Sequence, residues 1–287
     1  MISWPPALVS DIARRRCVIV LGAGISRNST NPDGRRPKTW EEFLRGAAES
    51  LTPRKHVKGL ISRDDYLTAC EVIKRKLGRD VFIGMLRDEF LTPGYQHAPI
   101  HDHIFALDSR IVATPNFDKI YETRANASAH GTIVLKHHYD PDVADIIRED
   151  GRLILKIHGS IDSPDRMIFT RSEYAKARSE YRSFYQILDS LAMTHTFLFL
   201  GCGTNDPDLK LLFEDVFFRH PHSRKHAMAL PRRALHNDVA KIVEETMNLS
   251  IITYSSASNH QELTDSVQEL GVMVENKRDE LRRSGNW

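Results

Sequence analysis

The stretch Cys17-Val-Ile-Val-Leu-Gly-Ala-Gly-Ile-Ser26 decides the fold. Its first five residues form a continuous apolar run, which predicts a strand buried on both faces, as in a parallel sheet. Gly22 and Gly24 let the backbone approach a pyrophosphate closely, and free N–H groups there provide an anion site. A dinucleotide fingerprint has a third glycine where this chain has Arg27, so a strand-turn that binds no ligand stays open as an alternative.

Five further apolar runs extend this pattern along the chain. They are Ile111–Ala113, Arg152–Ile157, Thr196–Leu200, Ala227–Leu230 and Ile251–Tyr254. The later runs alternate with helical stretches, one of which is predicted to begin at Asp206-Pro207 and to run through Val216. Strands that alternate with helices predict the α/β class, here a Rossmann-like parallel sheet flanked by helices.

Residues 40–109 interrupt the alternation with a helical insertion. Thr39 and Glu42 have capping-box spacing, apolar residues repeat at helical spacing over Tyr66–Leu77, and Val81–Phe90 predicts another helix. The sheet resumes at Arg110, so the chain 1–287 is predicted to form one domain. Its predicted parts are a core of about 15–39 and 110–255, the insertion of about 40–109, and a C-terminal helical segment of about 259–287 with a solvated face.

The composition is that of a globular protein, with 41% hydrophobic and 27% charged residues. Forty Lys and Arg against 38 Asp and Glu give a net charge of +2, which excludes a strong polyanion-binding field. Nucleic acid therefore stays a hypothesis that rests on local basic spots such as Arg14-Arg15-Arg16. The chain lacks a secretory pattern and an apolar run of about 20 residues, which predicts a soluble cytoplasmic protein without a membrane span.

The three cysteines lie far apart and include no C-x-x-C pair, which excludes a thiolate zinc site and a disulfide framework. Histidines occur in three close pairs, and we expect these pairs to be solvated surface residues rather than metal ligands. The pairs are His101 with His103, His137 with His138, and His220 with His222. We therefore predict no metal, and a nuclease supported by these histidines is the weakest alternative.

Polar or small residues follow three of the later predicted strands. Thr114-Pro-Asn116-Phe-Asp118 ends one run, His158-Gly159 the next, and Gly201-Cys-Gly203 a third. Because ligands in open α/β sheets bind outside the carboxyl ends of the strands, these motifs and the Gly22 turn point to one crevice. Taken singly, Asn116 would also suit the cap of a helix starting at Phe117, and His158 a turn.

The residues at the last of these strand ends, Gly201 to Gly203, can be interpreted in two ways. Small residues from Gly201 to Gly203 would allow close approach of a ribose or nicotinamide. Cys202 has no partnering base apparent in the sequence, so we interpret it as a packing residue. Asp206 is predicted to cap the following helix.

In this order the four motifs resemble the signature of sirtuin-like domains, over about residues 15–255. The resemblance implies a sheet that binds NAD, with Asn116 orienting the nicotinamide ribose and the attacking water, and His158 acting as general base. It implies that Gly22 to Ser26 hold the phosphates. The NAD-binding candidates are Gly22, Ala23, Gly24, Ser26, Thr114, Asp118, Gly201, Cys202 and Gly203; Asp118 is equally suited to start a helix.

The chain departs from the protein-deacylating sirtuins in two places. It has no cysteine quartet for their zinc ribbon, and Pro37 and Trp40 follow its glycine turn where those proteins have a Phe-Arg pair. It is more similar to the divergent bacterial sirtuin-like proteins that hydrolyse NAD in antiphage defence. That resemblance implies an NAD glycohydrolase yielding nicotinamide and ADP-ribose.

The same resemblance implies partners. It favours a protein partner in trans, in the manner of the sirtuin-like subunit that pairs with a HerA-type hexameric ATPase. Because unregulated NAD cleavage would kill the host, we also predict a homo-oligomer, with apolar positions of the insertion available for subunit packing. Two alternatives remain: an NAD-dependent protein deacylase or ADP-ribosyl transferase, and a non-catalytic module that senses NAD or ADP-ribose. Asn116 and His158 count against a pure sensor, because binding alone does not need them.

Overall fold

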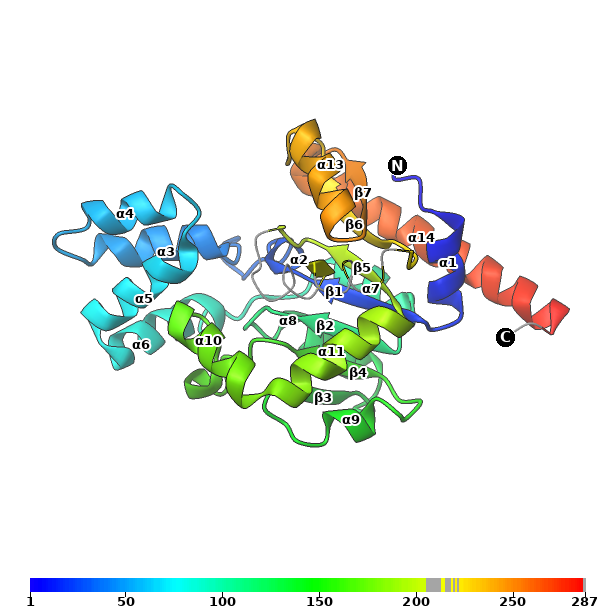
Figure 1. Ribbon diagram of the computed structural model, residues 1–287, viewed down its shortest axis with the longest axis horizontal. Helices are drawn as coiled ribbons and strands as arrows, with labels where there is room; N and C mark the ends of the chain where they lie inside the picture. The colour runs from blue at the N-terminus through cyan, green and yellow to red at the C-terminus, as the bar shows by residue number, and fades with distance from the viewer. Residues whose placement is uncertain (205–212, 215–217, 219, 221, 286–287) are drawn as a thin grey trace.

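The computed structural model describes residues 1–204, 213–214, 218, 220 and 222–285, and its centre is a seven-stranded sheet (Figure 1). The strands run in the order β3-β4-β2-β1-β5-β6-β7, and every neighbouring pair is parallel. Their bounds are β1 Cys17–Leu21, β2 Ile111–Thr114, β3 Val134–His137, β4 Leu153–Lys156, β5 Thr196–Leu200, β6 His226–Pro231 and β7 Leu249–Tyr254. The predicted Rossmann-like parallel sheet is confirmed.

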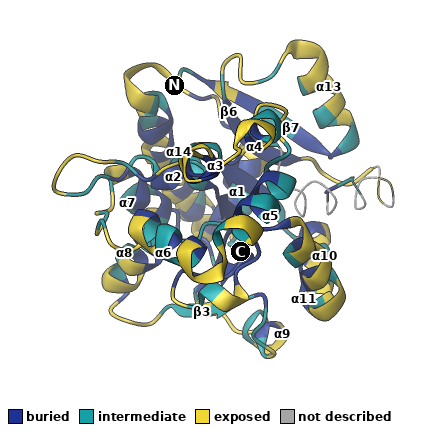
Figure 2. Ribbon diagram, turned by 90° about the vertical axis from the view of Figure 1, so that its left-hand side faces the viewer, coloured by how far each residue is buried: buried dark blue, intermediate teal, exposed yellow. Residues whose placement is uncertain are grey.

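Helices cover both faces of the sheet, and this explains the continuous apolar runs. All residues of β1, β2 and β4 are buried, with alternate side chains pointing into two separate apolar clusters. One cluster receives side chains from α1 Pro6–Ala13, α7 Pro99–Ala106, α8 Ile120–Ser128 and α14 Ala257–Ser284. The other receives them from α9 Val143–Ile146, α11 Arg182–Thr194 and α13 Asn237–Thr246. Figure 2 shows the strands buried between helices whose outer faces are exposed.

The central strand β1 marks the place where the chain changes direction across the sheet. From β1 the chain reaches β2, β4 and β3 on one side, and later β5, β6 and β7 on the other. In open α/β sheets the crevice at such a switch point binds ligands. The fold therefore places a binding crevice at the carboxyl ends of β1, β2 and β5.

The last helix of the predicted insertion, α7, packs on the sheet, whereas residues 40–90 fold into four helices to one side of it (Figure 1). They are α3 Trp40–Glu49, α4 Lys55–Ile61, α5 Tyr66–Leu77 and α6 Arg79–Phe90. The predicted capping box is present: the Glu42 amide donates to the Thr39 hydroxyl at 3.3 Å, and the Thr39 amide donates to the Glu42 carboxylate at 2.9 Å. The short elements α2 Ala23–Ser26 and η1 Pro164–Arg166, and the helix α10 Arg171–Glu180, complete the described part.

Three features differ from the sequence predictions. Strand β3 was not predicted, because at the sheet edge its residues are only half-buried or exposed and form no apolar run. The C-terminal helix has more than a solvated face, since it buries Leu263, Val267, Leu270 and Val274 against α1 and α7. The predicted helix from Asp206 lies outside the described residues, as does its proposed cap.

The surface assignment of the histidine pairs is wrong for two of the six residues. His101 is fully buried, and its ring nitrogen Nδ1 lies 3.1 Å from the Ala98 amide nitrogen on the inward side of α7. His138 is 2% exposed and packs edge-on against the rings of Tyr181 and Phe184. Over the part of the chain that is described, no helix is both long and apolar enough to cross a membrane.

Candidate functional site

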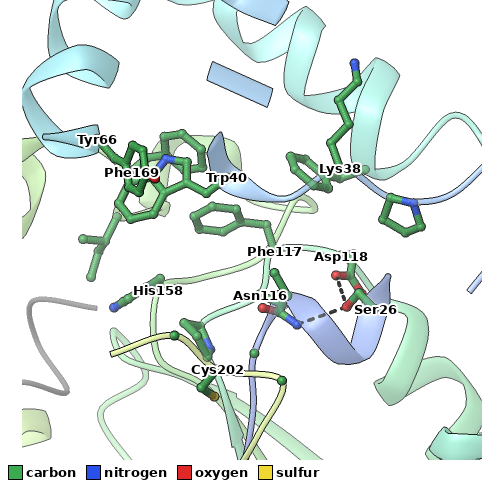
Figure 3. A pocket seen from close by; sticks show the side chains of 18 of the residues that line it. Ser26, Lys38, Trp40, Tyr66, Asn116, Phe117, Asp118, His158, Phe169 and Cys202 are labelled. Carbon is green, nitrogen blue, oxygen red and sulfur yellow. Dashed lines mark hydrogen bonds between the residues drawn. The ribbon is translucent and has the colours of Figure 1, made fainter. Parts of the chain in front are cut away.

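A pocket lies at the carboxyl ends of β1, β2, β4 and β5, between the sheet and the helical insertion (Figure 3). Nine predicted site residues line it: Gly22, Ala23, Ser26, Asn116, Asp118, His158, Gly201, Cys202 and Gly203. Both predicted catalytic residues are among them. The structure thus brings together side chains that four separate strand ends contribute.

The remaining two predicted residues, Gly24 and Thr114, lie behind the pocket wall and support it. The Gly24 amide donates to the carbonyl of Gly201 at 2.9 Å. The Thr114 hydroxyl donates to the carbonyl of Leu21 at 2.7 Å and accepts from the amide of Asn116 at 3.1 Å. Thr114 therefore fixes the turn that carries Asn116 to the end of β1.

The glycines of the first turn serve backbone packing. A Cβ atom on Gly22 would lie 2.4 Å from the carbonyl oxygen of Gly201, and one on Gly24 would lie 2.9 Å from the same atom. Because the Gly22, Gly24 and Ile25 amides donate to carbonyls of this turn and of β5, they are not the free anion-binding groups that the motif predicts. Glycine is needed here so that the two strand ends can touch.

Asn116 is held in one orientation by a chain of hydrogen bonds. Its side-chain nitrogen donates to the Ser26 hydroxyl at 3.0 Å, and this hydroxyl donates to the Asp118 carboxylate at 2.7 Å. The second oxygen of Asp118 accepts the Ile120 amide at 3.0 Å at the start of α8. Figure 3 shows the amide nitrogen of Asn116 turned toward Ser26 and its oxygen turned away. Asp118 thus accepts the amide of the first residue of α8, although the N-cap position itself is Lys119, and Asn116 does not cap a helix.

His158 is a buried side chain on the turn that follows β4. It is 3% exposed, and its Nδ1 atom lies 3.3 Å from the hydroxyl of Tyr174, whose ring contacts it edge-on. Gly159 adopts a φ of +85°, and the His158 carbonyl accepts the Ile168 amide at 2.9 Å. These contacts fix the ring beside the pocket.

An aromatic wall, which we define as Trp40, Tyr66, Phe117 and Phe169, encloses the other side of the pocket (Figure 3). The ring centroids of Trp40 and Tyr66 are 5.6 Å apart, as are those of Trp40 and Phe169, and Phe117 lies 4.8 Å from Phe169. The sequence prediction missed this wall as a site feature. The signal was the position of Trp40 directly after the capping residue Thr39, close to the glycine turn.

Charge at the pocket is sparse among the described residues. Among the described residues that line the pocket, Lys38 is the one lysine or arginine. Its ammonium lies 3.0 Å from the Glu89 carboxylate. Burial and a hydrogen bond to Asp64 raise the pKa of Tyr66, so its hydroxyl stays protonated. Cys202 is 9% exposed, and its sulfur lies 3.6 Å from the carbonyl oxygens of Val20 and Leu200.

Metal ligands do not gather in the described part of the structure, where no three His, Cys, Asp or Glu side chains are placed to share an ion. The buried His101 and His138 are each surrounded by helix or aromatic contacts instead. The chemistry that the described pocket offers is therefore that of an amide, an imidazole, hydroxyls and aromatic rings.

Comparison with known proteins gives one family. Residues 110–252 match the SIR2-like domain, a range that includes Asn116, His158 and Gly201. Defense-associated sirtuin 2 of Bacillus subtilis is 26% identical over 205 residues, which cover 70% of this chain and 19% of that protein. NAD(+) hydrolase ThsA of Enterococcus faecium is 26% identical over 210 residues, which cover 71% of this chain and 41% of that protein.

The chain thus spans less than half the length of these two relatives. A solved structure titled "Structural Basis for the Mechanism and Regulation of Sir2 Enzymes" aligns over 96% of both chains, with a TM-score of 0.47 and 15% identity. The family match covers the strand ends that carry the amide and the imidazole of the pocket. Residues 110–252 are therefore similar to the SIR2-like domain, the family that the sequence motifs resemble.

Proposed function

We propose that this chain cleaves NAD at the bond between nicotinamide and ribose and releases nicotinamide and ADP-ribose. The observation that carries the proposal is the meeting of Asn116 and His158 in one pocket, although they come from the ends of different strands. The names of the two relatives, an NAD(+) hydrolase and a defence-associated sirtuin, support it.

The chemical groups of the pocket fit this substrate. The aromatic wall suits stacking of a planar ring, and Lys38 at the pocket suits a phosphate. The amides of Gly22, Gly24 and Ile25 already donate to carbonyls. They therefore contribute less to phosphate binding than the glycine motif implies. The ribose then lies between the amide of Asn116 and the imidazole of His158.

The reaction needs a fixed ribose, a placed water and a proton acceptor. Loss of nicotinamide leaves positive charge at the ribose C1′ atom, and the cationic pyridinium departs without an acid. Asn116, with its nitrogen held by Ser26, presents an oxygen that orients a ribose hydroxyl or the attacking water without adding charge. The imidazole of His158, which lines the same pocket, accepts the proton as general base.

The first test supplies NAD and no acceptor. We expect nicotinamide and ADP-ribose in equal amounts from the purified chain, and no product from Asn116→Ala, which keeps the wild-type unfolding midpoint. Asn126→Ala, on the exposed side of α8, is the matched control and should cleave like the wild type. Nicotinamide release that requires an acyl-lysine or a protein acceptor would favour the deacylase or transferase, and binding without release would favour the sensor.

The second test separates the roles of the two residues. We expect His158→Ala to lower kcat by about 10²–10⁴-fold, the usual effect of one positioned acid–base group. Its dissociation constant for NAD, measured by calorimetry, should change far less. A loss of only a few-fold would contradict the general-base role.

We propose that NAD depletion by this chain serves bacterial antiviral defence in the cytoplasm. Such an activity harms its host unless it is gated, so we also propose a homo-oligomer controlled by a protein partner in trans, such as a HerA-type hexameric ATPase. Exposed apolar side chains on the insertion, Val81 and Leu91, support subunit packing. Mass measurement of the chain alone and with the partner tests this, and a monomer with full, partner-independent turnover would contradict it.

A further inference from the structure

A fully buried lysine lies beneath the pocket and is not part of its wall. Lys156 is the last residue of β4, two residues before His158, and its side chain is 0% exposed. An ammonium group is expensive to bury, so its partners decide what it does there.

Lys156 contacts the turn that carries Asn116. Its ammonium donates to the backbone carbonyl of Asp118 at 2.5 Å and to the Glu122 carboxylate, on α8, at 2.7 Å. Asp118 in turn holds the Ser26 hydroxyl that fixes the amide of Asn116. A continuous path of hydrogen bonds therefore runs from the end of β4 to the Asn116 side chain.

Two backbone hydrogen bonds reinforce the same junction. The Ile157 amide donates to the Thr114 carbonyl at 2.9 Å, and the Ile161 amide donates to the Phe117 carbonyl at 3.0 Å. These bonds join the end of β2 and the turn after it to the chain that follows Lys156. The lysine adds the tie to Asp118, at the residue where the turn becomes α8.

We propose that Lys156 is a positioning residue that locks the turn of Asn116 to the strand of His158, so that the two groups keep a fixed separation. This inference rests on the proposed function for its kinetic consequence, and on the geometry alone for its structural one. Glu122 supplies the counter-charge: burial raises the pKa of its carboxyl, and the neighbouring ammonium opposes that rise.

Fold stability alone does not require such a pair. Replacing a buried ion pair by apolar residues of similar volume is often neutral or stabilising, whereas removing one partner leaves an uncompensated charge. A variant that replaces both residues thus separates positioning from stability. Lys156→Met with Glu122→Leu keeps the volume and removes both charges.

The kinetic experiment compares this double variant with the wild type. We expect kcat for NAD cleavage to fall by at least tenfold, with KM within threefold, because the pocket wall is unchanged. Glu122→Gln, which keeps an oxygen for the ammonium and leaves the Asp118 contact, should lose less than threefold. Lys136→Met on β3, which removes the pair with Asp142, is the control and should match the wild type.

A second readout needs no turnover and applies to the wild type, Glu122→Gln and the double variant. Hydrogen exchange of peptides over 115–122 should speed up by at least tenfold in the double variant, while peptides over β5 keep their protection. If the double variant does not fold, Lys156→Met with Glu122→Gln, which also removes both charges, replaces it in both assays. Unchanged exchange over 115–122, or unchanged kcat in a folded variant, would overturn the inference. A wild type that is inactive both alone and with its partner, but shows the expected exchange, would instead refute the NAD cleavage.

Discussion

The reactive groups of the pocket are ordinary side chains whose orientation depends on their neighbours. An asparagine amide can turn over, exchanging its oxygen and nitrogen, unless hydrogen bonds prefer one arrangement. Here the Ser26 hydroxyl uses its proton on Asp118 and so can only accept from Asn116. The amide oxygen of Asn116 is therefore left for the substrate.

Ser26→Ala tests this dependence directly. Loss of the hydroxyl frees the amide to populate both orientations, and we expect kcat to fall by about tenfold, the value of one hydrogen bond near 1.4 kcal/mol. Ser29→Ala is the matched control, because Ser29 is also buried and its hydroxyl has no partner among the described residues. Equal activity of the two variants, measured by nicotinamide release, would show that Ser26 does not fix the orientation of the Asn116 amide.

At the residue scale the sequence predicts the polar half of the site and misses the aromatic half. Asn116 and His158 directly follow buried apolar runs, and parallel strands bring such residues to one edge. Tyr66 and Phe169 reach the pocket only because the insertion packs on the segment after β4. Contacts of that kind depend on tertiary packing, which no local spacing encodes.

At the scale of elements, the turn after β1 and the end of β5 meet at backbone contact distance. Gly201 has a φ of +64°, and a Cβ atom on it would lie 2.5 Å from the Ile25 nitrogen. A side chain there has to strain its own backbone and push the first turn away. The close approach also aligns the two glycine motifs that line the pocket.

Gly201→Ala should therefore destabilise the protein by about 3 kcal/mol, from a strained φ together with a backbone clash. Gly203→Ala is the matched control two residues later, where an added Cβ meets no described atom within 4 Å. We expect it to change the free energy of unfolding by less than about 1 kcal/mol. Urea unfolding measures both variants, and a loss in Gly201→Ala no larger than in the control would contradict the clash.

Strands can be predicted from the sequence where both of their faces are buried, because they then form continuous apolar runs. Strands β1 and β5 are read from their apolar runs, and the start of α3 from its capping box. The edge strand β3 escapes prediction because one of its sides has no strand neighbour and its side chains are mixed. In α14, charged residues toward its end conceal the stripe that packs on α1.

At the scale of the whole molecule, we propose that the insertion and the sheet fold as one unit. The insertion has its own apolar cluster, yet Ile161, Met167 and Phe169 from the segment after β4 belong to it. The same segment contacts His158 through Ile168. Because the pocket lies where the two parts join, the substrate is expected to stabilise the whole chain rather than one part.

Stability of the molecule should also depend on pH through a histidine far from the pocket. His226 begins β6, is 3% exposed, and accepts the Phe197 amide on its Nδ1 atom at 3.0 Å. Burial lowers its pKa to about 4. In the unfolded chain an ordinary histidine has a pKa near 6.5, so between these values the unfolded state binds the proton and the folded state does not.

This difference predicts that the contribution of His226 to the free energy of unfolding is fully present above pH 6.5 and is lost as the pH falls from 6.5 to about 4. Below about pH 4 this histidine causes no further loss. Across the window it amounts to about 3 kcal/mol, from roughly 1.4 kcal/mol per pH unit. His226→Asn places an amide oxygen where Nδ1 accepts and removes the titration, so its stability deficit relative to the wild type should shrink between pH 7 and pH 4.5. His56→Asn, at an exposed position of α4, is the control for the substitution. Urea unfolding at both pH values decides the matter: parallel losses in the wild type and His226→Asn would show that another group carries the acid sensitivity.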